Sequence, residues 1–205
     1  MDDEQHINQQ AIARIKRGDL SGLEMLVRKH QVKAVYAAYL VLQDRQLAED
    51  VVQNAFLRVV ERIAQYDDSR SFEFWFFRVV VNAALDSARQ DHRWVSLDAN
   101  AEANVEDIEG MQVEWLINTQ PCPQDLVETS ELRNAVRLAL KKLNADQRAA
   151  IVLRYFLDMS EAEMSAAINR PTSTIKWRLH EAKRHLKEIL RPIFQPSLDE
   201  IKDEE

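Results

Sequence analysis

Apolar residues recur at helical spacing along most of the chain, and short polar breaks separate the repeats. In the first half the spacing predicts helices over residues 7–17, 20–42 and 47–63, and a fourth from residue 72 onward. Each helix carries one broad apolar stripe and one polar side. Helices of this kind become stable by packing their stripes together, so the pattern predicts a helical bundle.

The fourth predicted helix opens with five aromatic residues in six positions. A helix spreads such a run round more than half of its circumference, so one face cannot bury every ring. Two interpretations stay open: a crowded core seam, or one or two exposed rings that stack on unpaired bases beside neighbouring arginines. The aromatic residues are Phe72, Phe74, Trp75, Phe76 and Phe77, and the arginines are Arg70 and Arg78.

Residues 94–130 have a different character, with eight acidic side chains, no basic one, and Gly110, Pro121 and Pro123. This composition predicts a mobile linker that contains one apolar island around Trp115. The single cysteine, Cys122, lies between two prolines. It excludes an internal disulfide and fits a reducing cytoplasm.

Helical spacing resumes at residue 131 and leads to two short helices joined by a tight turn. Asn144 with Gln147, and Ser160 with Glu163, have the spacing of capping boxes that start helices. Asn169 is suited to a left-handed residue at the turn. Pro192 is expected to end the last helix.

The second of these short helices is basic, which is the helix-turn-helix pattern, and such a helix enters the major groove of DNA. An ordinary helical hairpin with a solvated basic face is the alternative. On the DNA-binding interpretation, the candidate DNA-contacting residues of the second helix are Thr172, Ser173, Thr174, Lys176, Trp177, Arg178, His180 and Lys183.

Composition and charge narrow the class of protein. The chain has 205 residues and only three glycines, which favours an all-α fold of two small helical domains joined by a long acidic linker. No apolar run approaches the roughly 20 residues of a membrane span, so no membrane insertion is expected. The N-terminus is acidic and polar, unlike a secretory signal.

The net charge of −7 argues at first against nucleic acid, but its distribution reverses that argument. Residues 131–194 carry 13 basic and 7 acidic side chains, whereas the acidic excess lies in residues 94–130 and 195–205. Because phosphate binding depends on the local field, the positive block that holds the helix-turn-helix is a candidate DNA-binding domain.

Three stretches resemble the extracytoplasmic-function-type sigma factors, the promoter-recognition subunits of bacterial RNA polymerase. They are GDLSGLEMLV with AEDVVQNAFLRVVE, then FEFWFFRVVVNAALDSAR, and finally LNADQRAAIVLRYFLDMSEAEMSAAINRPTSTIKWRLHEAKRHLKEIL. The resemblance covers about residues 12–93 and 131–191. It implies a polymerase-docking and −10 element-binding domain at 1–93, an acidic linker at 94–130, a −35 element-binding domain at 131–194 and an acidic tail at 195–205.

The resemblance also assigns residues to each task. The helix around residues 50–58 looks like the family's docking helix for the clamp of the largest polymerase subunit. The loop at 66–72 and the helix through Arg89 look like the reader of the melted −10 element, and Arg78 and Asn82 match the family's R-x-x-x-N pattern. The docking residues implied are Asp50, Gln53, Asn54, Phe56 and Arg58; the −10 residues are Arg70, Phe72, Trp75, Arg78, Asn82 and Arg89; the −35 residues are the eight named above.

This sequence departs from the family pattern at Val81, Asn169, Ser173 and Glu181. Glu181 stands on the recognition helix where a basic residue is frequent. It could accept a hydrogen bond from cytosine, or it could orient Lys176 or Arg184, which is the favoured reading. The resemblance further implies core RNA polymerase and promoter DNA, duplex at −35 and melted at −10, as partners. Many relatives also have an anti-sigma partner.

Three alternatives are weaker. A stand-alone helix-turn-helix regulator would explain residues 131–191 but would leave the docking helix and the aromatic run unused. An α-helical enzyme has little support, because the five histidines lack metal-ligand pairing and Cys122 has no thiol partner. A helical adaptor that binds polymerase without reading DNA would not need the excess of basic side chains in residues 131–194. We therefore expect a non-enzymatic sigma factor with no metal and no cofactor.

Overall fold

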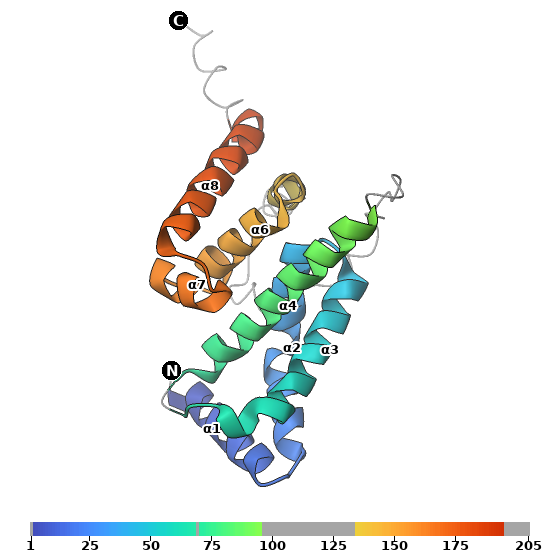
Figure 1. Cartoon of the computed structure of the whole chain (residues 1–205), viewed down its shortest axis with the longest axis vertical. Helices are drawn as coiled ribbons and strands as arrows, with labels where there is room; N and C mark the ends of the chain where they lie inside the picture. The colour runs from blue at the N-terminus through green and yellow to red at the C-terminus, as the bar shows by residue number, and fades with distance from the viewer. Residues whose placement is uncertain (1, 69, 96–133, 195–205) are drawn as a thin grey trace, which may run out of the picture.

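The computed structural model describes residues 2–68, 70–95 and 134–194, and all regular structure in these ranges is helical (Figure 1). The all-α prediction is therefore confirmed. The predicted linker with its Trp115 island and Cys122, and the acidic tail at 195–205, lie outside the described residues.

The N-terminal part is a bundle built on α2 (Ser21–Leu42), which packs against α1 (Asp2–Lys16), α3 (Arg45–Arg62) and α4 (Phe72–Val95). A short 3₁₀ turn, η1 (Ile63–Gln65), ends α3. Gly22 allows α1 and α2 to approach closely, because a Cβ atom at this position would lie 2.3 Å from the carbonyl oxygen of Ala11. The close approach buries Ala11, Ile15 and Leu26.

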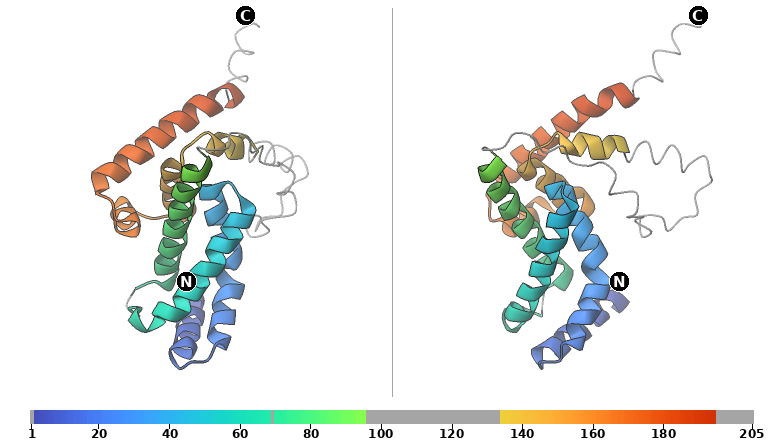
Figure 2. Two further views of the ribbon diagram at one scale, coloured as in Figure 1. Left: turned by 45° about the vertical axis from the view of Figure 1, so that its right-hand side comes forward. Right: turned by 90° about the vertical axis from the view of Figure 1, so that its right-hand side faces the viewer.

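The C-terminal part begins with a helical stretch at 134–141 and continues through α6 (Ala145–Ile151), η4 (Val152–Phe156), α7 (Glu161–Ile168) and α8 (Thr172–Phe194). Segment η4 is a π-helix, which the sequence pattern did not predict. Helix α8 packs on α6 and α7 (Figure 2). Helices α7 and α8 form the predicted helix-turn-helix.

The predicted helix starts and the predicted turn are confirmed. Asn144 with Gln147 and Ser160 with Glu163 both form complete capping boxes. Asn169 adopts a left-handed conformation with φ 49° and donates its N–H to the carbonyl of Ser165. The short polar side chains satisfy backbone groups that a helix end would otherwise leave unpaired.

The prediction that Pro192 ends the last helix is wrong, because α8 continues through it to Phe194. Proline lacks the N–H that would bond to the carbonyl four residues earlier. Because Pro192 lies close to the end of α8, the helix loses one hydrogen bond in its last turn and the hydrogen bonds in its middle are kept. The expectation treated a weak stop signal as a strict one.

The two parts of the chain pack directly against each other. Helices α6 and α7 lie along α4, and α6 and η4 also contact α2 (Figure 2). One continuous set of buried apolar side chains includes residues of both parts, such as Phe77 and Leu153. The sequence indicated two domains with a tether but gave no indication of this contact.

Candidate polymerase and nucleic-acid interfaces

One side of α3 exposes a continuous stripe of polar side chains. Asp50, Gln53, Asn54 and Arg58 are all exposed, and their spacing of three, four and eight residues places them on one helix face. Phe56 is different, because it is 5% exposed and packs 4.6 Å from the ring centroid of Phe76. Phe56 therefore supports the helix from inside, and the expectation that it contacts a partner does not fit this free structure.

Leu57 lies within this stripe and is 59% exposed. The apolar pattern of α3 did not single it out. Its register could have done so, since it stands four residues after Gln53 and three after Asn54. An exposed leucine framed by amide and charged groups is the composition expected at the centre of a protein interface.

The aromatic run at the start of α4 is mainly core. Phe72, Phe76 and Phe77 are buried, while Phe74 and Trp75 are half-buried. Trp75 packs against the ring of Tyr66 at 5.3 Å between centroids. Phe72, predicted to contact DNA, is only 3% exposed, so its ring belongs to the core and not to an exposed stacking surface.

A buried histidine ties α1 to this aromatic cluster. His30 donates from Nε2 to Oδ1 of Asn8 at 2.9 Å, and its ring lies against Phe72, Phe76 and Phe77. Burial lowers the pKa of His30 to about 4, so the imidazole is neutral at pH 7. The pair is a satisfied polar contact inside the bundle, where an unpaired donor would be costly.

A pocket opens between α1 and the loop that precedes α4. Its lining includes Asn8, Gln9, Asp68 and Arg70. The loop is held in shape by the Tyr66 hydroxyl, which donates a hydrogen bond to the carbonyl of Arg70. Burial raises the pKa of Tyr66 to about 12, so this hydroxyl stays protonated as a donor. The loop thus contributes Tyr66, Asp68 and Arg70 to the lining of a largely polar hollow.

Two polar side chains of α4, Asn82 and Arg89, face the C-terminal part. Asn82 donates from Nδ2 to the carbonyl of Arg78 at 2.9 Å and to the carbonyl of Ala167, in α7, at 2.6 Å. Arg89 pairs with Asp86 on its own helix and with Asp146 of α6, each at 3.3 Å. Two of the residues expected to read DNA are therefore engaged across the contact between the parts.

The outer face of α8 is exposed as the helix-turn-helix pattern predicts. Trp177 is 63% exposed, Lys176 lies 3.6 Å from Glu161, and Lys183 lies 5.5 Å from the ring centroid of Tyr155. Thr174 is half-buried at the first turn. The other exposed members of this face are Thr172, Ser173 and His180.

Arg178 departs from its neighbours on α8. Only 12% of its side chain is exposed, and Nη1 lies 3.0 Å from a carboxylate oxygen of Asp146 in an ion pair. Asp146 therefore faces Arg178 and Arg89 at once. Nothing in the local pattern of the sequence distinguishes Asp146 as a bridging carboxylate.

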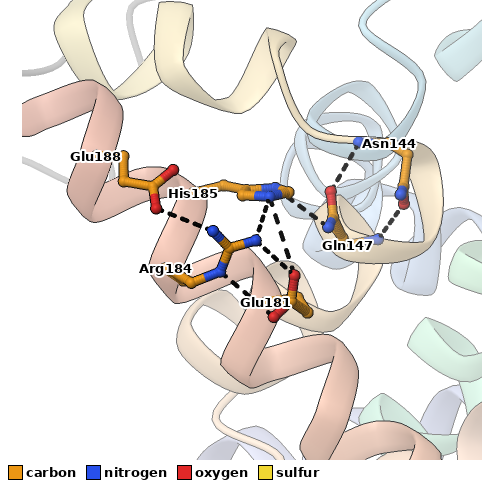
Figure 3. Close-up of polar contacts among 6 residues, drawn as sticks. All are labelled: Asn144, Gln147, Glu181, Arg184, His185 and Glu188. Atoms are coloured by element: carbon orange, nitrogen blue, oxygen red, sulfur yellow. Dashed lines mark hydrogen bonds and ion pairs between the residues drawn. The ribbon is translucent and has the colours of Figure 1, made fainter.

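A polar network fixes α8 on the start of α6 (Figure 3). Gln147, the third residue of the capping box, lies 3.3 Å from Nδ1 of His185. Glu181 pairs with Arg184 at 2.8 Å, and Arg184 also reaches Glu188 at 2.9 Å. The hydrogen bond from Arg184 lowers the pKa of Glu181. Of the two readings of Glu181, its pairing with Arg184 is the one that this geometry shows.

Known protein families match both parts of the chain. The Sigma-70 region 2 model matches residues 26–94, and the Sigma-70, region 4 model matches residues 133–186. The ECF RNA polymerase sigma factor SigW of Bacillus subtilis is 30% identical over 183 residues, which cover 89% of this chain and 96% of SigW. The chain belongs to the ECF sigma factors.

Two further relatives support this assignment over almost the whole length. The sigma factor is 28% identical to the ECF RNA polymerase sigma-E factor of Escherichia coli K12, over 94% of this chain and 98% of the relative. It is 24% identical to the RNA polymerase sigma-H factor of Pseudomonas aeruginosa, over 93% and 97%.

Solved structures share the fold. CnrH in complex with the cytosolic domain of CnrY has a TM-score of 0.56 at 21% identity and covers 92% of this chain and 97% of that chain. The sigma factor RpoE of Bartonella quintana, in complex with the anti-sigma factor NepR, has a TM-score of 0.59 at 23% identity and covers 82% and 94%.

As a sigma factor, the protein binds RNA polymerase and directs it to promoters, which is a regulatory role in transcription. Within the described residues, no group of three or more histidine, cysteine, aspartate or glutamate side chains could hold a metal ion. No helix in the same residues combines the length and the apolar character that crossing a membrane requires.

Proposed function

We propose that three separate faces divide the work of this sigma factor: the α3 stripe docks on polymerase, the 66–72 loop with α4 reads the melted −10 element, and α8 reads the −35 duplex. The observation that carries the proposal is the placement of these faces on three different helices of one chain. In terms of domains, residues 1–93 dock on polymerase and bind and melt the −10 element, and residues 131–194 bind the −35 element. Residues 94–130 link these two domains, and residues 195–205 form an acidic tail.

The docking face consists of Asp50, Gln53, Asn54, Leu57 and Arg58. Leu57 supplies the apolar centre, and the polar groups around it supply hydrogen bonds and charge complementarity. The partner is the clamp of the largest polymerase subunit. A stand-alone regulator would have no use for this face, which is why that alternative is not favoured.

For the −10 element, the pocket beside the 66–72 loop receives an unstacked base, with Arg70 in its lining. Trp75 packs against Tyr66, another residue of that lining. Single-stranded nucleic acid is held by aromatic stacking together with a cationic track along the backbone. Arg78, Asn82 and Arg89 continue that track along α4. Phe72 contributes indirectly, because its buried ring packs against Trp75 and holds the aromatic cluster in place.

For the −35 element, α8 enters the major groove with Trp177 and His180 facing bases and with Lys176 and Lys183 near phosphates. Thr172, Ser173 and Thr174 lie at the N-terminus of α8, where hydroxyl and backbone N–H groups suit a phosphate. Arg178 reaches DNA only if it leaves Asp146. The network around His185 holds the helix in place.

The experiment is to measure the affinity of the chain for purified core polymerase with Leu57→Ala, and with Leu20→Ala as the control. Leu20 is 63% exposed and lies outside the α3 stripe. We expect Leu57→Ala to weaken binding by about tenfold, the loss of one interface leucine, and Leu20→Ala to leave it unchanged. Equal affinity for both variants and the wild type would contradict the docking assignment.

We also propose that the protein acts in the cytoplasm, where its relatives serve RNA polymerase, and that an anti-sigma partner holds it inactive. The support for a partner is that the two solved structures described above are complexes, one of them with an anti-sigma factor. Co-purification of the tagged chain with a partner that competes with core polymerase is the expected result.

A further inference from the structure

Trp177 is a large apolar side chain on the exposed face of α8. It is 63% exposed, and no other large hydrophobic residue is exposed among residues 172–191, the part of α8 whose side chains the structure describes. Within the described residues, its indole makes no hydrogen bond and no contact with another ring. The ring therefore adds little to the packing of its own domain and is free to contact another molecule.

The basic residues on either side of Trp177 are turned toward partners on the protein. Lys176 lies 3.6 Å from a carboxylate oxygen of Glu161, and Arg178 lies 3.0 Å from one of Asp146. Adjacent residues on a helix point about 100° apart, so these two cations flank the ring and do not cover it. The centre of the exposed face is consequently apolar, with positive charge at its edges.

The acidic residue one helical turn further along is also engaged. Glu181 stands four residues after Trp177 and so lies on the same face of α8. Its carboxylate pairs with Arg184 at 2.8 Å, and Nε2 of His185 lies 4.0 Å away (Figure 3). A carboxylate held in this way neither repels a phosphate strongly nor competes with the indole for a base.

The place of Trp177 along α8 suits contact with bases rather than with the DNA backbone. Helix α8 begins at Thr172, so Trp177 lies in its second turn. In helix-turn-helix proteins, the residues near the N-terminus of the recognition helix are the ones that contact base edges. If α8 enters the major groove, the indole meets the edge of a base pair.

An indole can recognise few of the groups that line the major groove. It has one N–H donor and no acceptor, so it cannot accept a hydrogen bond from the amino groups of adenine or cytosine. The apolar group that the major groove offers is the 5-methyl group of thymine, which lies beside the O4 acceptor of the same base. Thymine is therefore the base whose edge best matches an exposed indole.

We propose that Trp177 is a specificity-determining residue of this sigma factor and reads one thymine of the −35 element through its 5-methyl group. The proposal rests on the proposed function of α8 as the reader of the −35 duplex. Removing one buried carbon from an apolar contact changes affinity by about fourfold. Loss of that methyl group from the DNA should therefore weaken binding by about this factor.

The first test compares the sequences that core polymerase selects from a pool of random duplex DNA when it carries the wild-type chain or Trp177→Ala. We expect Trp177→Ala to lose the preference for one A·T base pair in the upstream element and to keep the other preferences. Leu138→Ala is the control, because Leu138 is 57% exposed and lies outside α8. Unchanged preferences in Trp177→Ala, or a preference lost at a G·C pair, would overturn the proposal.

The second test isolates the methyl group. In the selected duplex the thymine is replaced by uracil, which lacks only the 5-methyl group. Polymerase with the wild-type chain should bind the uracil duplex about fourfold more weakly, whereas polymerase with Trp177→Ala should bind both duplexes equally. Trp177→Phe keeps an apolar ring without the N–H donor and should retain the discrimination. Equal binding of the two duplexes by the wild type overturns the proposal, and this comparison does not depend on the folding of any variant.

Two further measurements separate the thymine contact from other roles of the ring. Because the ring is exposed, Trp177→Ala should unfold at the same urea concentration as the wild type, and it should bind core polymerase with equal affinity. A loss of core binding in Trp177→Ala alone would assign the ring to polymerase and overturn the proposal. If the wild type selects no upstream sequence, the −35 role of α8 fails and the thymine contact fails with it. If the wild type selects a sequence that Trp177→Ala also selects, only the thymine contact fails.

Discussion

Neighbouring residues on one helix of this sigma factor face quite different surroundings. On α8, Lys176 and Trp177 are exposed, whereas Arg178 next to them is 12% exposed and held by Asp146. The sequence predicted the basic face as a whole, because helical register follows from spacing. It did not predict the state of Arg178, because the partner that buries it stands more than thirty positions away in α6.

Lys176→Ala tests a phosphate contact. If Lys176 neutralises one phosphate, its loss should weaken binding to all duplex sequences alike and reduce the slope of log K against log salt by about 1. The measurement is affinity of the chain, with core polymerase, across a salt series. His180→Ala serves as comparison, since a base contact should change preference at one position and leave the salt slope intact.

His30 makes the stability of the bundle depend on pH. Its pKa is lowered to about 4 in the folded chain, whereas the unfolded value is about 6.5. Above pH 6.5 the ring is neutral in both states. Below that value the unfolded state gains the proton first, so stability falls as the pH falls toward 4.

Replacing His30 by glutamine removes this titration. Between pH 7 and pH 5 the wild type should lose about 2 kcal/mol more stability than His30→Gln. Urea unfolding at the two pH values measures the difference, with His6→Gln as control because His6 is exposed. Equal pH dependence of the wild type and His30→Gln would show that His30 is not held neutral by burial.

At the scale of elements, the local rules of helix ends predicted most of the fold. The capping boxes at Asn144 and Ser160 and the left-handed Asn169 were predictable because a few neighbouring residues decide them. The π-helix η4 was not, because a one-residue widening of a helix depends on the packing around it. Pro192 shows the converse, a local stop signal that the end of α8 tolerates.

Gly22→Ala tests the contact between α1 and α2. The added Cβ would lie 2.3 Å from the backbone oxygen of Ala11, so the helices must move apart. Helix propensity favours alanine by about 1 kcal/mol, but overpacking against backbone costs about 1 to 3 kcal/mol or more. We expect a net loss of about 1 to 2 kcal/mol in urea unfolding.

The control is Gly18→Asn in the turn between the same helices. Gly18 has φ +82° and open space around its Cα, and asparagine tolerates left-handed backbone. We expect a smaller loss there than at Gly22. A Gly22→Ala variant as stable as the wild type would mean that α1 packs more loosely than the structure indicates.

At the scale of the whole molecule, the division into two helical parts was predictable from charge and composition, but their contact was not. Asn82 and Ala167 are 85 residues apart, and Val41 and Arg148 are 107 apart. Spacing along the chain reports on one element at a time, and carbonyl acceptors have no sequence signature. The same reason explains why Leu57 was missed: its exposure depends on which faces of α3 the neighbouring helices cover.

The central claim is that this chain directs RNA polymerase to promoters through its three faces. Run-off transcription tests it most directly, with purified core polymerase, with and without the chain, on genomic promoter fragments that include the region upstream of its own gene. The account predicts discrete new transcripts that require the chain and weaken when Leu57 or Lys176 is replaced by alanine. Absence of transcripts together with absence of binding to core polymerase would contradict it.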